Sequence, residues 1–197
     1  MNKTKQVWGV TKPFILASAS PRRLQLLKNA GFVPEKVVSA DIDETEKEGE
    51  DPAAYVARVS KQKALHVAGA NPNMCVLAAD TIIVARGQII RKAPNKEKAR
   101  ENLEILSGGQ HYVLTGYCLV MADGKVISKV VKTTVMTKKF TSAEKDTLIA
   151  SNEWRNVAAY KIEGILSALI KGIKGSYPNI IGLPIYEVAE DLRKALK

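Results

Sequence analysis

Apolar and polar positions alternate along this chain in two patterns: short unbroken apolar runs, and stretches with an apolar residue every three or four positions. The short runs favour strands buried on both faces of a sheet, and the wider spacing favours amphipathic helices. Predicted strands lie at 14–17, 37–40, 74–79, 82–84, 89–90, 112–121, 126–136 and 166–170. Predicted helices begin after Ser20, Asp51, Asn95, Thr141 and Pro184, which suit helix starts. Hairpin turns are predicted at 86–88 and 123–124.

The junction between the first strand and the first helix has the features of an anion site. Ser20 suits an N-cap, and Pro21 suits the first helical position. A helix that begins there points unpaired backbone N–H groups at a small space, to which Ser18, Arg22 and Arg23 add hydroxyl and guanidinium groups. Arginine opposes the helix dipole at this end, which is easier to explain if an anion lies between them. The junction predicts a phosphate site; the alternative is an ordinary helix start whose arginines reach solvent.

Acidic residues suggest where a metal and a catalytic base lie. Asp41-Ile42-Asp43-Glu44 places three carboxylates in four residues, which indicates either a solvated loop or oxygen ligands for Mg²⁺. Asp80 interrupts an apolar run, and burying a carboxylate without a partner is costly, so we expect Asp80 to have a partner or a chemical task. The hairpin at 86–88 returns Lys92 toward the level of Asp80. Lys92 then neutralises phosphate charge or stabilises the acid, unless it is a surface lysine at a strand end.

Composition narrows the choice of partner and compartment. The 197 residues carry a net charge of +10, so we expect an anionic partner: a nucleotide, a nucleic acid or a membrane surface. Cys75 and Cys118 each lie in an apolar run, which predicts buried free thiols and a reducing cytoplasm. Residues 1–12 have no long apolar core, and no apolar span reaches membrane length, so we expect neither export nor membrane insertion.

Histidine is too scarce to supply the chemistry. The chain has two histidines, His66 and His111, which excludes a histidine-rich metal site and disfavours a Ser-His-Asp triad. Any catalytic chemistry must then come from carboxylates, lysines and arginines. Lysines on the predicted helix after Asp51, Lys63 among them, are expected to face water on sequence grounds alone.

Several separate motifs in register make the chain resemble the Maf family from Phe14 onward. They are Ser18-Ala19-Ser20-Pro21-Arg22-Arg23, Asp41-Ile42-Asp43-Glu44, Ala79-Asp80-Thr81, Lys92, Leu106-Ser107-Gly108, Tyr160-Lys161-Ile162-Glu163-Gly164, and Gly175-Ser176-Tyr177 with Gly182-Leu183-Pro184. The resemblance implies an α/β fold of the inosine-triphosphatase-like type: an elongated mixed β-sheet flanked by helices, with two lobes and a cleft between them. It also implies a single domain over 1–197, with 1–12 as a flexible extension, and a homodimer.

The resemblance further implies a nucleoside triphosphate pyrophosphatase that uses a divalent cation, Mg²⁺ or Mn²⁺. In the family, the position matching Asp80 is the proton acceptor. Positions matching Arg22, Thr81 and Glu163 bear on base choice, those matching Ser18, Arg23, Lys63 and Lys92 line the phosphate region, and the one matching Glu44 holds the metal. This agrees with the residues themselves, because hydrolysis of a triphosphate needs neutralised phosphate charge, an in-line water and a base.

Three departures from the family pattern bear on substrate choice. Ala93 replaces the usual proline after the lysine, 155–158 replaces an Asp-Lys-Ala-Gly stretch, and Glu163 replaces the usual glutamine. Arg22 and Thr81 resemble the group that acts on dTTP and UTP, which is the main interpretation. The carboxylate of Glu163 suits 7-methyl-GTP or another modified nucleotide as the alternative. An alternative of another class is a non-enzymatic regulator of septum formation that binds an acidic partner or nucleic acid, although no helix-turn-helix or aromatic RNA platform is evident.

Overall fold

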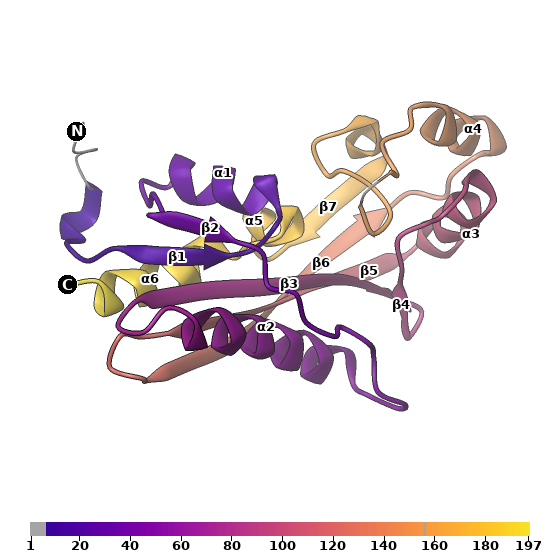
Figure 1. The fold of residues 1–197 in the computed structure, drawn as a ribbon. Helices are drawn as coiled ribbons and strands as arrows, with labels where there is room; N and C mark the ends of the chain where they lie inside the picture. The colour runs from indigo at the N-terminus through magenta and orange to yellow at the C-terminus, as the bar shows by residue number, and fades with distance from the viewer. Residues whose placement is uncertain (1–6, 156) are drawn as a thin grey trace. The chain divides into compact units, whose positions relative to one another are not determined.

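The computed structural model describes residues 7–155 and 157–197 of the chain. Its strands are β1 (Phe14–Ala17), β2 (Lys36–Val38), β3 (Cys75–Ala85), β4 (Gln88–Ile90), β5 (Gln110–Val120), β6 (Val126–Thr137) and β7 (Ile170–Lys174). Its helices are α1 (Pro21–Asn29), α2 (Pro52–Gly69), α3 (Lys96–Leu106), α4 (Ser142–Ala150), α5 (Tyr177–Ile181) and α6 (Ile185–Ala195), with 3-10 helices η1 (Val7–Gly9) and η2 (Ile165–Leu169). Figure 1 shows the alternation of strands and helices.

The strands form one mixed sheet of seven strands in the order β2-β1-β3-β5-β6-β7, with β4 paired to β3. β1 runs parallel to β2 and β3, whereas β4 is antiparallel to β3 and β7 is antiparallel to β6. Helices follow the parallel strands, as a parallel connection requires. The predicted α/β fold, a mixed sheet flanked by helices, is confirmed.

By its internal contacts the chain divides into two compact units. Unit 1 comprises residues up to Thr81, Thr115–Val131 and Gly182–Lys197, and unit 2 comprises Ile82–Leu114 and Lys132–Ile181. Residues 1–6 of the predicted extension lie outside the described residues. Lys12 and Thr11 each donate a backbone hydrogen bond to the carbonyl of Leu196 within unit 1, at 3.1 and 2.9 Å.

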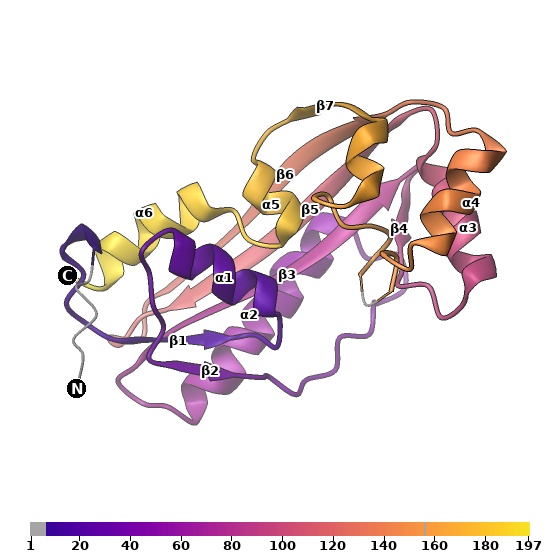
Figure 2. The ribbon, with the colours of Figure 1, turned by 90° about the horizontal axis from the view of Figure 1, so that it is seen from above.

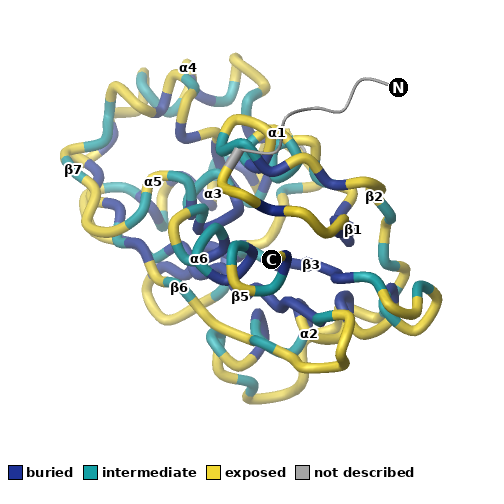
Figure 3. Tube along the Cα trace, turned by 90° about the vertical axis from the view of Figure 1, so that its left-hand side faces the viewer, coloured by how far each residue is buried: buried dark blue, intermediate teal, exposed yellow. Residues whose placement is uncertain are grey.

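Unit 1 has an apolar layer on each face of its strands, because successive strand residues point to opposite sides. On β1, Phe14 and Leu16 pack with α1 and α6, whereas Ile15 and Ala17 pack with α2. Figure 2 shows α1 and α6 in front of these strands and α2 behind them. Figure 3 shows β3 and β5 as largely buried stretches.

Gly116 on β5 lets α2 lie directly against the sheet. A Cβ atom at this position would clash with the backbone carbonyl of Val56 on α2. The close approach therefore depends on the absence of a side chain at position 116, and it brings the buried face of α2 to β3 and β5.

The predicted helix starts are confirmed in detail at three positions. The Asp51 side chain accepts hydrogen bonds from the N–H groups of Ala53 and Ala54 before α2. Asn95 caps α3, and Thr141 forms the predicted capping box at α4. Ser20 occupies the N-cap position of α1, but its side chain makes no capping hydrogen bond.

Unit 2 is built around a second apolar cluster and contains the predicted β3–β4 hairpin, in which Ile83 pairs with Ile90. The predicted strand at 166–170 is wrong for most of its length, because η2 occupies Ile165–Leu169 and β7 begins at Ile170. Hydrogen bonds explain the difference: the Gly164 carbonyl accepts from Ser167 at 3.0 Å, which starts a helical turn. The turn buries Leu166 and leaves Ile165 exposed. The short helix α5 was also not foreseen. Among the described residues, no helix combines the length and apolar character needed to cross a membrane.

Candidate active site

Asp80 and Thr81 lie on β3 just beyond the end of β1 within unit 1. The register pairs Ala17, the last residue of β1, with Ala78. Asp80 therefore extends the row of Val76 and Ala78, which faces α2, and Thr81 extends the row that faces α1 and α6. Adjacent residues of one strand thus serve two different clusters of polar groups.

The first cluster joins two carboxylates through one ammonium group. Lys63 Nζ donates a hydrogen bond to Asp80 Oδ1 at 2.8 Å and lies 2.9 Å from Glu44 Oε1. Lys63 and Asp80 are 9% and 8% exposed, whereas about half of the Glu44 side chain is accessible (46%). Because an unpaired buried carboxylate is costly, the ion pair explains how Asp80 is tolerated in an apolar strand. The partner that the sequence required for Asp80 is Lys63.

Lys63 lies on the buried face of α2. The expectation that it faces water is therefore wrong. Val59, Ser60 and Val67 are also buried there, at the helical spacing of three and four residues from Lys63. That spacing was visible in the sequence and could have marked Lys63 as a core-facing lysine in need of an acidic partner.

The second cluster fixes the guanidinium of Arg23. Its Nε donates to the Gly182 carbonyl at 2.8 Å, Nη1 to Ser18 Oγ at 3.2 Å and Nη2 to Thr81 Oγ1 at 3.1 Å. Thr81 Oγ1 also lies 2.9 Å from Thr115 Oγ1. Burial lowers the pKa of Arg23 from its ordinary value, and the charges of Asp80 and Glu44 oppose that shift. The second cluster is therefore electrostatically linked to the first.

Arg22 differs from its neighbour. Within residues 7–155 and 157–197, its guanidinium makes no hydrogen bond or ion pair that would commit it to the fold. Its charge is close enough to Arg23 to lower the pKa of that residue further. Ser18 shapes the turn before α1 by accepting a hydrogen bond from the Ser20 N–H at 3.2 Å. The predicted phosphate site thus combines one immobilised arginine, one uncommitted arginine and the first turn of a helix.

The acidic segment 41–44 resolves into unequal carboxylates. Asp43 accepts a hydrogen bond from the Thr45 N–H at 2.8 Å, which closes a local turn, and the side chain of Thr45 followed by its main chain lowers the pKa of Asp43. Glu44 reaches Lys63 instead. No group of three histidine, cysteine, aspartate or glutamate side chains able to hold a metal ion occurs in the described part of the chain. The oxygen donors of Glu44 and Asp80, which converge on one cation, still fit Mg²⁺ or Mn²⁺, because such ions take one or two carboxylates and complete their shell with phosphate and water.

Two predicted site residues belong to unit 2. Lys92 is exposed two residues after β4, and Glu163 is exposed in the turn before η2. That turn is held by the Lys161 carbonyl, which accepts from Gly164 at 3.1 Å, and by Glu153, which accepts from the Ile165 N–H at 2.8 Å.

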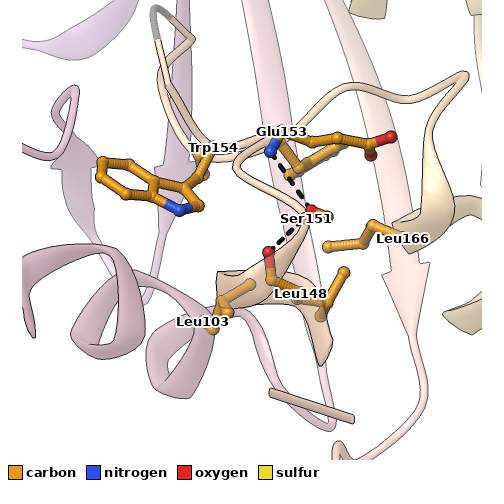
Figure 4. Close-up of a pocket in the computed structure, with 8 residues that line it drawn as sticks. Leu103, Leu148, Ser151, Glu153, Trp154 and Leu166 are labelled. Atoms are coloured by element: carbon orange, nitrogen blue, oxygen red, sulfur yellow. Dashed lines mark hydrogen bonds between the residues drawn. The ribbon is translucent and has the colours of Figure 1, made fainter. Parts of the chain in front are cut away.

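Unit 2 contains a small apolar pocket (Figure 4). Leu103, Leu148, Trp154 and Leu166 line it, and Ser151 Oγ links the Leu148 carbonyl to the Glu153 N–H. None of the predicted site residues lines this pocket. Its lining includes Tyr160 and Leu166, which precede and follow Glu163 in the sequence.

The sequence matches a family model described as "Maf-like protein" over residues 13–195. The chain belongs to the Maf family. The family predicted from the motifs is therefore confirmed, and the match includes each of the predicted site residues.

Several curated relatives share about two fifths of their residues with this Maf chain. One from Paramagnetospirillum magneticum is 42% identical over 177 residues, which cover 89% of this chain and 93% of that protein. One from Caulobacter vibrioides is 42% identical, covering 88% and 90% of the two chains, and one from Agrobacterium fabrum is 43% identical, covering 88% and 87%. All three are named dTTP/UTP pyrophosphatase.

Proposed function

We propose that this chain is a nucleoside triphosphate pyrophosphatase that hydrolyses dTTP and UTP to the nucleoside monophosphate and pyrophosphate. Curated relatives that align with almost all of the chain carry that name, which supports the activity. The observation that carries the proposal is Asp80, a buried carboxylate paired with Lys63 beside the arginine-bearing helix start.

Asp80 acts as the base. Hydrolysis breaks the anhydride between the α and β phosphates, and the attacking water must lose a proton. Lys63 holds Oδ1 of Asp80, which fixes the carboxylate and leaves Oδ2 to accept that proton. The pairing also offsets the buried charge while no substrate is bound.

The cations of unit 1 receive the phosphates. Arg23 is oriented by three acceptors, so its charge is placed before substrate arrives. Arg22, Ser18 and the first turn of α1 donate to phosphate oxygens, and Lys92 supplies a further positive charge.

Glu44 holds the divalent cation, Mg²⁺ or Mn²⁺, together with substrate phosphate. Its carboxylate is half accessible and already adjacent to the compensating charge of Lys63. When bound, such an ion supplies Lewis-acid stabilisation of the negative charge that develops on the phosphates.

The nucleobase of the substrate is selected by Arg22, Thr81 and Glu163. The family group that has arginine and threonine at the first two positions favours pyrimidines. The exposed carboxylate of Glu163 only accepts hydrogen bonds, so it also suits the adjacent N1–H and N2–H groups of a guanine-type base. This feature keeps 7-methyl-GTP as the second candidate substrate.

The protein acts in a reducing cytoplasm, and copies of it pair. Cys75 and Cys118 are free and buried, and burial raises the pKa of Cys75 to about 12, which suits thiols that are not used for disulfides. The pairing of copies is carried over from the family resemblance.

A nucleotide panel tests the proposed function. The pure protein is incubated with dTTP, UTP, 7-methyl-GTP and unmodified purine nucleotides, each with Mg²⁺ or Mn²⁺, and pyrophosphate and monophosphate are quantified. We expect both products from dTTP and UTP, with Asp80→Asn as the inactive control. Release of orthophosphate and diphosphate would refute the bond assignment. No hydrolysis of any nucleotide would favour the regulatory alternative.

A further inference from the structure

The segment 41–51 carries Glu44 from β2 to α2 without any strand or regular helix of its own. A ligand on such a segment is useful only if the main chain around it is held in place. The contacts that hold this segment come from the first half of α2. The second half of the same helix carries Lys63.

Arg58 of α2 holds the segment through a bidentate ion pair with Glu50. Its Nε and Nη2 donate to the two carboxylate oxygens of Glu50, each at 2.6 Å, and Nη2 also donates to the Thr45 carbonyl at 3.0 Å. The Arg58 and Glu50 side chains are 18% and 9% exposed. Arg58 lowers the pKa of Glu50 to about 2, so this carboxylate stays ionised throughout the neutral range. One guanidinium thus joins both ends of the turn that follows Glu44.

Tyr55 holds the residue itself, one helical turn before Arg58. Its hydroxyl donates to the backbone carbonyl of Glu44 at 3.0 Å, and the tyrosine is 3% exposed. The Arg58 guanidinium lies 5.5 Å from the centre of the Tyr55 ring. The main chain at Glu44 is therefore fixed by Tyr55, and its carboxylate meets Lys63 farther along the same helix.

We propose that Arg58 and Tyr55 are positioning residues that hold the acidic segment so that the Glu44 carboxylate is presented to the divalent cation. The inference rests on the proposed function, which assigns the metal to Glu44. Neither residue touches the reacting atoms. A mainly stabilising role explains the geometry less well, because the same guanidinium also binds the main-chain carbonyl of Thr45, the residue directly after Glu44.

The test uses two variants. Arg58→Met removes the guanidinium group, and Arg58→Lys keeps the positive charge but cannot bind both oxygens of Glu50 in the same way. The matched control is Gln62→Ala, because Gln62 accepts a hydrogen bond from the same arginine at 3.1 Å, while no hydrogen bond among the described residues joins it to 41–51. Amide hydrogen exchange of the metal-free protein reports on residues 43–50. Mn²⁺ binding is followed by electron paramagnetic resonance with a non-hydrolysable dTTP analogue.

In Arg58→Met we expect faster exchange at 43–50 and about tenfold weaker Mn²⁺ binding, the lower end of the usual effect of losing a group that orients a metal ligand. The kcat at saturating metal should stay within about threefold of wild type. Arg58→Lys should be intermediate, and Gln62→Ala should match the wild type.

Unchanged exchange, or faster exchange with unchanged Mn²⁺ affinity, would overturn the positioning role. Glu44→Gln separates this failure from failure of the proposed function. If Glu44→Gln weakens Mn²⁺ binding while Arg58→Met does not, only the inference is lost. If Glu44→Gln has no effect on Mn²⁺ binding, the metal assignment fails and the inference fails with it.

Discussion

Replacing Lys63 with methionine removes the ammonium group that contacts both Asp80 and Glu44. Methionine has a similar length and keeps the apolar stem of the side chain, so the change isolates the ammonium group. In the wild type the Lys63 ammonium lies 2.8 Å from Asp80, which is 8% exposed on an apolar strand. In the variant this buried carboxylate loses that partner. Breaking a buried ion pair in this way costs about 3–5 kcal/mol.

We place the cost for Lys63→Met near the lower limit, at about 3 kcal/mol, because the second carboxylate, Glu44, is half accessible and can be solvated. For a chain of this size that loss corresponds to a fall in Tm of about 6–12 °C. Adding Asp80→Asn removes the stranded charge, so the double variant should be more stable than Lys63→Met by about 1–2 kcal/mol. The two substitutions are therefore not additive.

Urea denaturation of the four proteins in this double-mutant cycle measures the prediction. Lys61→Met is the matched control, since Lys61 is exposed on the same helix and its loss should change stability by less than about 0.5 kcal/mol. The reasoning is refuted if Lys63→Met unfolds at the same urea concentration and with the same slope as the wild type. It is also refuted if the effects of the two substitutions simply add.

Three further predictions concern catalysis, base choice and pH. Asp80→Asn should fold normally yet lower kcat for pyrophosphate release by about 10²–10⁴-fold, and near-normal turnover would contradict its role as base. Glu163→Gln should raise kcat/KM for dTTP and UTP relative to 7-methyl-GTP by about 3- to 10-fold, a modest change because the side chain is exposed; an unchanged ratio would remove it from base selection. Burial lowers the pKa of His111 to about 4, so the unfolded chain binds the extra proton first and stability falls as pH drops from about 6.5 toward 4. Urea denaturation at several pH values should show this loss, and His111→Gln should reduce it; an equal slope in both proteins would contradict it.

Local chemistry explains why much of the fold was predictable. The strand, turn and helix at 14–29 follow from an apolar run, a Ser-Pro start and helical spacing, all of which act within a few residues. The failure at 166–170 has the same origin, because Leu-Ser-Ala-Leu fits either a strand or a helical turn. A further contact at this turn, in which Glu153 accepts a hydrogen bond from the Ile165 N–H, joins residues twelve positions apart and leaves no local signal.

The contacts among the predicted site residues could not be predicted from the sequence. Asp80 was expected to have a partner, and the family motifs named Lys63, yet only packing shows that the two meet. The Gly182 carbonyl, which accepts from Arg23 across 159 positions of the chain, leaves no local signal at either residue. No local signal marks Arg58 either, because its contacts depend on the path of the segment 41–51.

The contacts also explain why the site needs more positive charge than the arginines and lysine of unit 1 supply. Lys63 and Arg23 together offset the charges of Asp80 and Glu44, so Arg22 is the predicted site cation of unit 1 that these two carboxylates leave for substrate. A nucleoside triphosphate brings about four negative charges at neutral pH, since each phosphate ionises fully or nearly so. Arg22, Lys92 and a helix N-terminus, which acts as about half a charge, balance only part of them. The ion pairs that stabilise the buried charge of Asp80 thus occupy cations that would otherwise bind the phosphates. A divalent cation would supply the missing positive charge, and this is the physical reason to assign it to the exposed carboxylate of Glu44.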